Sequence, residues 1–314
     1  MMRELKILAV IVVFTLITYY LVEPFAHSQM HKHVEGEGFT YSDLPALTKT
    51  GDAVKGKELV MGAAACTGCH AITKEGMAAG MDPAMAAQSY GVNPPDLSNA
   101  GVVYDAKFLA ALIKNPAHAL KVEHKFDAAK GKMHPMPQFY GAGGDIDQEI
   151  ADIVAYLQSI APKAEELTSE QAYKLACGGC HENRYAGWTQ VGQTPKFKKK
   201  QDELKFNLAK ADYQDALTKY MGKLPPDLSI YIRSRGEHYI KTFVEDPQAY
   251  LAGTAMPRVG ISTAGMEKVI EYLEDSGDAK RHERESIGPK VMLFTLVFAL
   301  FAFLWKKELW SKLH

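Results

Sequence analysis

The sequence contains two copies of the pattern Cys-x-x-Cys-His, at residues 66–70 and 177–181. This pattern is the attachment signature of a c-type haem, in which two sulfurs form thioethers to the porphyrin and the histidine binds the iron. A redox dithiol and half of a zinc site share the Cys-x-x-Cys part, but the chain has no further cysteine to complete a zinc site. The sequence therefore predicts two covalently bound haem c groups, held by Cys66, Cys69 and His70 and by Cys177, Cys180 and His181.

The size and charge of the chain narrow the classes of protein to consider. Its 314 residues suffice for two domains of ordinary size with extra segments. The formal net charge is only −1, so nothing indicates a nucleic-acid-binding protein. Because haem is attached covalently outside the bacterial cytoplasm, the part that carries the haem motifs is expected to be exported.

Both ends of the chain are apolar enough to anchor it in a membrane. Residues 5–22 are apolar apart from Lys6 and two threonines. As a helix with a rise of about 1.5 Å per residue they would span roughly 27 Å, close to the thickness of the hydrocarbon core. A cleaved signal peptide is the alternative, but a Glu-Pro-Phe sequence at 23–25 follows the run instead of a small-x-small cleavage site. The second expected span covers residues 289–305, where a lysine and tryptophans suit the membrane interface.

Basic residues flank the outer ends of both spans. Arg3 and Lys6 flank the outer end of the first, and Lys306, Lys307 and Lys312 follow the second. Positively charged residues prefer the cytoplasmic side of a membrane. Both termini are therefore expected in the cytoplasm and residues 23–288 in the periplasm, with the chain anchored in a bacterial inner membrane by two transmembrane helices.

A series of landmarks occurs twice in the same order. They are a leading helix (52–65 and 168–176), the haem motif, the pentapeptide Pro-Pro-Asp-Leu-Ser (94–98 and 225–229), a helix that ends before proline (106–113 and 239–244), a Met-Pro pair (136–137 and 256–257) and a closing helix (147–159 and 264–273). Such an ordered recurrence indicates a tandem duplication. The repeated unit is similar to the small, mostly helical class I cytochrome c fold.

The expected fold class is mainly α, with two tandem class I cytochrome c domains and a transmembrane helix at each end. The domains are expected at 51–160 and 168–286, joined by a linker at 161–167. The anchors are expected at 1–23 and 287–314, with a connector at 24–50. That connector contains His27, His31 and His33, which we interpret as a connector or a partner contact rather than a metal site, because no cysteine or carboxylate cluster accompanies them.

Each iron needs a sixth ligand unless it binds a substrate. Met136 and Met256 are the candidates, because each precedes a proline on a loop between the last two helices of its unit. A thioether is a soft, neutral ligand that favours ferrous iron and suits electron transfer. Alternative ligands are Met133 and His134 for the first haem and Met221 and Met266 for the second. With both faces filled, neither iron would have an open position for catalysis.

Two basic features of the second unit have no counterpart in the first. Arg233 and Arg235 follow the second Pro-Pro-Asp-Leu-Ser sequence, and a guanidinium can bind a haem propionate through two hydrogen bonds. The alternative is that both arginines are solvated. Lys196 and residues 198–200 form a basic cluster that could dock an acidic partner, although a solvated loop is the favoured interpretation.

Residues 225–239 resemble a specific family. Pro-Pro-Asp-Leu-Ser followed by Ile-x-x-Arg-x-Arg-Gly-x-x-Tyr is similar to the corresponding stretch of cytochrome c1, the haem subunit of the quinol–cytochrome c reductase (bc1) complex. The C-terminal segment 283–314 also resembles the cytochrome c1 anchor, so the similarity covers about residues 168–314. The first domain resembles a generic class I cytochrome c, and the whole chain resembles the dihaem cytochrome c1 of some bacterial bc complexes, including those of epsilonproteobacteria.

The resemblance implies a function and a set of partners. The chain would carry electrons from a Rieske iron–sulfur protein to a soluble cytochrome c or a terminal oxidase, next to a cytochrome b subunit in a dimeric complex. It would be an electron-transfer subunit of an oxidoreductase, without a catalytic site of its own. The c1-like haem would be held by Cys177, Cys180, His181 and Met256, and its propionates by Arg233 and Arg235. Ordinary cytochrome c1 has one haem and one anchor, whereas two of each are expected here.

Three other functions fit part of the pattern. The dihaem subunit of a haem–copper oxidase has two such domains and an N-terminal anchor, but it lacks a c1-like C-terminal span. A dihaem peroxidase needs one iron with an open or displaceable ligand, which two Met-Pro candidates argue against. A membrane-tethered electron carrier without a fixed partner must move between partners, and a single membrane anchor would suffice for it. The anchor expected at each end of this chain argues against that function.

Overall fold

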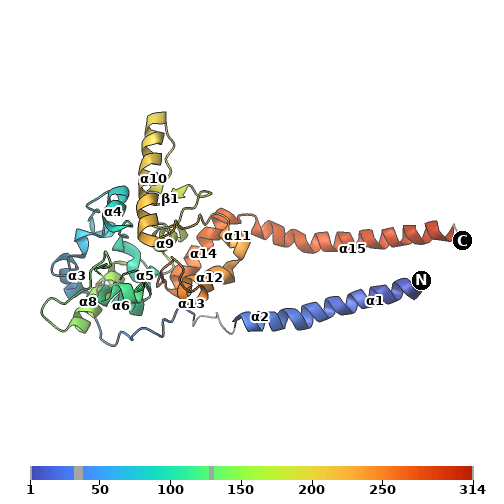
Figure 1. Cartoon of the computed structure of the whole chain (residues 1–314), viewed down its shortest axis with the longest axis horizontal. Coiled ribbons are helices and arrows are strands. Elements are labelled where there is room, and N and C mark those ends of the chain that lie inside the picture. Colours follow the sequence, from blue (N-terminus) through green and yellow to red (C-terminus); the bar gives the residue numbers. More distant parts are fainter. Residues whose placement is uncertain (1, 32–37, 127–130, 313–314) are drawn as a thin grey trace.

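The computed structural model describes residues 2–31, 38–126 and 131–312 as a mainly helical body with two long helices extending from it (Figure 1). In this described part the strands are β1 (Trp188–Thr189) and β2 (Gly192–Gln193), which pair antiparallel. The mainly α fold class expected from the sequence is confirmed. His33 lies outside the described residues, as do the side chains of His27 and His31.

The first half of the body is organised around a close crossing of two helices, α3 (Ala53–Met61) and α8 (Ile146–Ile160). Gly56 lies at the crossing, where a Cβ atom would come 1.9 Å from the carbonyl oxygen of Asp152. Asp52 caps α3 by accepting hydrogen bonds from the next turn, as the sequence predicts. The shorter helices of this half are η2 (Cys66–Gly68), η3 (Thr73–Glu75), α4 (Pro83–Tyr90), η4 (Leu97–Asn99), α5 (Ala100–Val103), α6 (Ala106–Lys114) and α7 (Pro116–Ala119).

The second half repeats the crossing with α9 (Ser169–Ala176) and α14 (Thr263–Gly277). Thr168 and Gln171 form the capping box that the sequence predicts at the start of α9. Ala172 stands four residues after its cap, as Gly56 does in α3, and is fully buried. The other helices of this half are α10 (Lys200–Met221), α11 (Tyr231–Arg235), α12 (Glu237–Glu245) and α13 (Pro247–Tyr250).

The helix α10 has no counterpart in the sequence analysis, which interprets residues 198–200 as part of a loop. It is 22 residues long and projects from the body (Figure 1). Its second half packs against α4 of the first half through Tyr213, Leu217 and Met221. The spacing of these three side chains at i, i+4 and i+8 is the signal that could have predicted the buried part of this helix.

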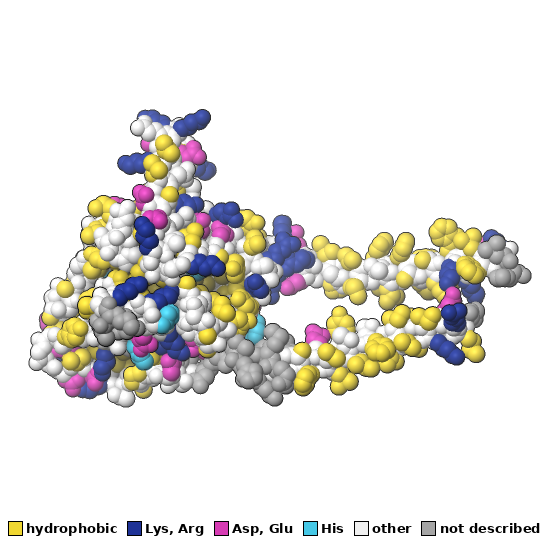
Figure 2. Space-filling view, in the orientation of Figure 1, with side chains coloured by type: hydrophobic (Ala, Val, Ile, Leu, Met, Phe, Trp, Pro, Cys, Tyr) yellow, Lys and Arg dark blue, Asp and Glu magenta, His cyan; other side chains and the backbone are white. Residues whose placement is uncertain are grey.

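The two apolar terminal segments are long helices, and none of their described side chains is buried (Figure 2). The N-terminal run comprises α1 (Met2–Ile17), the π-helix η1 (Thr18–Val22) and α2 (Glu23–His31), and the C-terminal one is α15 (Arg281–Ser311). The segments Met2–Ala26 and Arg281–Ser311 are long and apolar enough to cross a membrane. Both helices extend beyond the predicted spans and leave the body in one direction (Figure 1), and Glu4 pairs with Lys306 at 3.5 Å.

The π-helical turn has a local cause in Pro24. Proline lacks a backbone N–H, and its ring collides with the carbonyl group four residues earlier in a regular α-helix. The chain widens by one residue just before it, and the N–H of Glu23 donates to the carbonyl of Thr18, five residues back. The helix therefore continues through the proline instead of ending there.

Candidate haem sites

Each Cys-x-x-Cys-His motif folds into one tight helical turn. The N–H of His70 donates to the carbonyl of Cys66 at 2.9 Å, and that of His181 donates to the carbonyl of Cys177 at 2.8 Å. The leading helix α9 ends at Ala176, immediately before the second turn, whereas α3 ends at Met61, four residues before the end predicted from the sequence, and a short connection leads to Cys66. The two thiols and the imidazole of each motif are thereby gathered within a single turn, as thioether attachment and proximal ligation require.

Both histidines are oriented by the same partner, the second proline of the repeated Pro-Pro-Asp-Leu-Ser sequence. Nδ1 of His70 donates to the carbonyl of Pro95 at 2.8 Å, and Nδ1 of His181 donates to that of Pro226 at 2.7 Å. A carbonyl can only accept, so the proton is on Nδ1 and the lone pair of Nε2 is available for a metal. Burial lowers the pKa of both imidazoles, which keeps them in the neutral form that binds iron.

The aspartate and leucine of the two pentapeptides also make matching contacts. The N–H of Leu97 donates to the carbonyl of Ala71, the residue after His70. The N–H of Leu228 donates to the carbonyl of Glu182, the residue after His181, and both distances are 2.9 Å. Asp96 and Asp227 each accept from the serine two residues later, both at 2.8 Å. The repeated sequence is therefore the element that holds each histidine loop in place.

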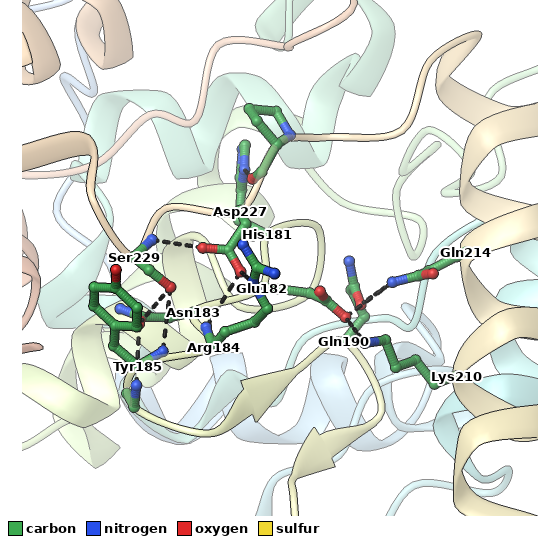
Figure 3. A network of polar contacts seen from close by, with 12 residues as sticks. His181, Glu182, Asn183, Arg184, Tyr185, Gln190, Lys210, Gln214, Asp227 and Ser229 are labelled. Carbon is green, nitrogen blue, oxygen red and sulfur yellow. Dashed lines mark hydrogen bonds and ion pairs between the residues drawn. The ribbon is translucent and has the colours of Figure 1, made fainter. Parts of the chain in front are cut away.

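The second of these loops is shown in Figure 3. Asp227 accepts from the backbone and the guanidinium of Arg184, at 3.3 and 2.9 Å. Burial alone would raise the pKa of Asp227, but the hydrogen bonds from Ser229 and Arg184 outweigh it and lower this pKa. On the other side, Glu182 binds Lys210 at 2.7 Å, which ties the haem motif to α10.

Cys66, Cys177 and Cys180 do not have the character of reactive thiols in a redox dithiol. All four cysteines are free thiols in the structure. Burial raises the pKa of Cys177 to about 12 and that of Cys180 to about 11, and it also raises the pKa of Cys66. Reactive Cys-x-x-Cys pairs instead have a lowered thiol pKa. The sulfur, imidazole and backbone groups of both motifs fit a covalently attached haem, with His70 and His181 as iron ligands.

The axial methionine candidates differ in their surroundings. Met256 is half-buried and packs against the core cluster that contains Cys177. Met136 is half-buried on a loop that is anchored by a hydrogen bond of 3.0 Å from the N–H of Phe139 to Ile113. Their assignment as iron ligands stays a prediction.

The alternative ligands occupy other environments. Met266 and Met221 are buried in the two hydrophobic cores, with exposed fractions of 1% and 7%. Met133 is 67% exposed. The ring of His134 lies against Phe126, and its Nε2 is 3.3 Å from the hydroxyl of Tyr220. These positions favour Met256 over its two alternatives at the second site.

Arg233 and Arg235 are both exposed on α11. The guanidinium of Arg235 lies over the ring of Tyr239, 5.4 Å from its centre, and Arg233 contributes to lowering the pKa of Asp278. Both side chains are therefore accessible to an anionic group. Binding of haem propionates by these two residues stays a prediction.

One residue that no sequence motif indicates, Tyr213, joins the two sites. The hydroxyl of Tyr213 on α10 donates to the carbonyl of Gly179, inside the second haem motif, at 2.7 Å. The same oxygen accepts from the N–H of Asn93 at 3.0 Å, two residues before the proline that orients His70. Tyr213 is fully buried. A lone tyrosine in a region without a predicted helix carries no sequence signal for such a contact.

Two of the comparisons with known proteins found a match. The cytochrome c family model matches residues 53–161. No curated protein matches the chain. A solved chain described as "Hyperthermophilic respiratory Complex III" is 23% identical, with a TM-score of 0.35, over 48% of this chain and 76% of that one. Residues 53–161 therefore form a cytochrome c domain, an electron-transfer domain that implies covalently bound haem c.

Proposed function

We propose that this protein is a membrane-anchored dihaem cytochrome that carries electrons within a quinol-oxidising complex of the bc1 type. It would take electrons from the Rieske iron–sulfur protein and deliver them to a soluble cytochrome c or a terminal oxidase. Bound at both motifs, the two haem irons would supply the one-electron redox chemistry. The residues of the chain attach the haems, orient the proximal imidazoles and fill the sixth positions.

The observation that carries the proposal of two haems is the equivalence of the two sites. In each, an Nδ1–H···O=C hydrogen bond to the second proline orients the histidine. In each, the leucine N–H of the pentapeptide donates to the carbonyl of the residue after that histidine, at 2.9 Å. The first site lies in the cytochrome c domain. The same contacts at Cys177, Cys180 and His181 support the same cofactor there.

The connection to the terminal helices supports the order of electron flow. The closing helix α14 leads into α15 through only a few residues, and Arg284 of α15 binds Asp278 at 2.5 Å. In Figure 1 the helices α11, α12 and α14 lie at the base of the two long helices, whereas α3 and α8 lie farther away. The second site is thus the better candidate to receive electrons from a membrane complex, and the first is the better exit to a soluble partner.

The partners within the complex rest on the cytochrome c1 resemblance of residues 225–239 and of the C-terminal segment. On this basis we propose a cytochrome b subunit, a Rieske protein and a second copy of the complex. The haem domains would lie in the periplasm, with both termini in the cytoplasm. The two long apolar helices, which end close to one another, are consistent with this arrangement.

Purification in a mild detergent through a tag on this chain tests the proposal. Mass spectrometry of the purified material is expected to find a b-type cytochrome and a Rieske protein. The control is an unrelated tagged membrane protein purified from the same membranes, which reports nonspecific recovery. Recovery of a haem–copper oxidase subunit without the other two proteins would contradict the bc1 assignment.

If electrons pass directly between the two haems, the hydroxyl of Tyr213, which joins the two haem-binding segments, is expected to matter for that transfer. In Tyr213→Phe the ring stays and both hydrogen bonds of the hydroxyl are lost. The part-buried Gly179 carbonyl and Asn93 N–H then lack this partner, so the free energy of unfolding is expected to fall by about 1 to 2 kcal/mol. The segments that hold the two haems also lose their direct link, and electron exchange between the haems is expected to slow.

Denaturant titration and flash photoreduction of one haem measure the two effects of this variant. Tyr140→Phe is the matched control, because Tyr140 is 73% exposed and its hydroxyl is not part of either haem segment. We expect the control to behave as the unmodified chain in both measurements. Unchanged stability and unchanged exchange in Tyr213→Phe would exclude a role for this hydroxyl in joining the sites.

A further inference from the structure

The loop that carries Met256 belongs to the second half of the chain, but it is held by the first half. Three backbone hydrogen bonds connect the two: Arg258 to Leu120 at 3.0 Å, Asp105 to Gly260 at 2.9 Å and Ser262 to Val103 at 2.8 Å. The loop also meets the first half through the isolated β-bridge between Tyr104 and Ile261. The conformation around Met256 therefore depends on contacts outside the second unit.

Arg258 is the largest fully buried side chain of this attachment. Its exposed fraction is 1%, and Nε donates to the carbonyl of Ala119 at 2.9 Å. Nη1 lies 2.8 and 2.7 Å from the two carboxylate oxygens of Asp43. A buried guanidinium whose carboxylate partner is removed becomes an uncompensated charge. The pair with Asp43 is therefore a condition for the present position of Arg258, two residues after Met256.

Asp43 comes from the connector that precedes the first domain. Tyr41 and Leu44 of this connector are buried, and the hydroxyl of Tyr41 donates to the carbonyl of Ile261 at 2.7 Å. The guanidinium of Arg258 lies over the ring of Tyr41, 5.6 Å from its centre. The connector thus contacts the Met256 loop through a charge pair, a hydrogen bond and an aromatic ring.

Among the described residues, the methionine loop of the first site has no buried ion pair like that of Arg258 and Asp43, and its His134 reaches the second half at the hydroxyl of Tyr220, 3.3 Å from Nε2. The residue two positions after Met136 is Gln138, which is exposed, whereas Arg258 is buried. Residues 131–133, Pro135 and Pro137 are exposed as well. The two methionine loops share the Met-Pro sequence but differ in how they are held.

We propose that Arg258 and Asp43 are positioning residues for Met256, so that the connector and the first domain fix the sixth ligand of the second haem. This inference rests on the proposed ligation by Met256. An ordered loop keeps the sulfur close to the iron and lowers the entropy that ligation costs. Without the ion pair, the loop gains freedom, and a competing ligand replaces the sulfur more easily.

The test uses the full-length chain in detergent, with the variant Asp43→Ala. Asp43 is half-exposed, so its truncation creates no cavity, and the haem-to-protein ratio reports whether both haems are still attached. The readouts are the methionine-to-iron charge-transfer band of the ferric protein and a titration with imidazole. We expect imidazole to displace the methionine of the second haem at a concentration about tenfold lower, which corresponds to about 1.4 kcal/mol.

Two internal comparisons separate positioning from general destabilisation. The first haem, followed by electron paramagnetic resonance in the same sample, is expected to keep its affinity for imidazole. Asp147→Ala removes an exposed ion pair with Lys114 and is expected to leave both haems unchanged. Arg258→Lys keeps the charge but loses the Nε–H that binds the carbonyl of Ala119, so its effect is expected to lie between those of the unmodified chain and Asp43→Ala.

Met256→Leu distinguishes a failure of this inference from a failure of the ligand assignment. If Met256→Leu abolishes the charge-transfer band of the second haem and Asp43→Ala leaves the imidazole titration unchanged, the positioning role is wrong and the ligand stands. If Met256→Leu leaves the band intact, Met256 is not the ligand and the inference falls with it. Equal shifts at both haems in Asp43→Ala would also overturn the positioning role.

Discussion

Substituting Met256 by leucine is expected to lower the reduction potential of the second haem by at least about 100 mV, a fraction of the roughly 0.8 V that axial ligands span. The thioether sulfur stabilises ferrous iron, and leucine has a similar volume but offers no lone pair. The iron would then be five-coordinate or bind water, and the oxidised state would gain relative stability. A potentiometric titration followed by absorbance measures the change, with the first haem as a reference in the same sample.

Met266→Leu is the matched control for this substitution. Met266 is 1% exposed in the core of the second half, and a volume-conserving exchange there costs less than about 1.5 kcal/mol. The potential of the second haem is expected to stay unchanged in this variant. A fall in potential with Met266→Leu, and none with Met256→Leu, would show that Met266 is the iron ligand and that Met256 is not.

Replacing Gly56 by alanine is expected to destabilise the first domain by about 2 kcal/mol or more. The new Cβ would lie 1.9 Å from the carbonyl oxygen of Asp152 and 2.8 Å from Cβ of Tyr156, so α3 and α8 must separate. Overpacking of this kind costs about 3 kcal/mol, which exceeds the gain of about 1 kcal/mol from the better helix propensity of alanine. Thermal unfolding of the full chain, followed by circular dichroism and haem absorbance, measures the loss.

Gly80→Ala controls for the change of residue type. No atom lies within 4 Å of a Cβ at Gly80, so this variant is expected to unfold as the unmodified chain does. The second domain has Ala172 at the position that corresponds to Gly56, and its haem signal is expected to persist to a higher temperature in Gly56→Ala. Equal stability of Gly56→Ala and Gly80→Ala would show that the crossing of α3 and α8 is looser than the structure has it.

The features that the sequence predicts well are those set by nearby residues. Asp52 and Thr168 begin the two leading helices because a short polar side chain can cap the N–H groups two or three residues later. The haem motif identifies both histidines for the same reason, since its chemistry lies within five residues, whereas the proline carbonyls that orient them are 25 and 45 residues farther along the chain. The closing helices are one to four residues longer at their ends than predicted, because helix boundaries depend on packing as well as on sequence.

The features that the sequence analysis missed depend on contacts between distant residues. Arg258 and Asp43 are 215 positions apart, and neither lies in a motif. Tyr213 joins two segments that both precede it in the sequence, on a helix whose outer half is exposed and whose buried apolar spacing appears only in its inner half. These contacts arise from how the two repeated units pack against one another, which a single sequence does not specify.

The central claim is that this chain carries two haems, one at each Cys-x-x-Cys-His motif. The most direct measurement is the intact mass of the full chain after purification in detergent. The account predicts the mass of the polypeptide plus two haem groups, and the loss of one haem in Cys66→Ala/Cys69→Ala and of the other in Cys177→Ala/Cys180→Ala. A mass with a single haem that is unaffected by the second double substitution would contradict it.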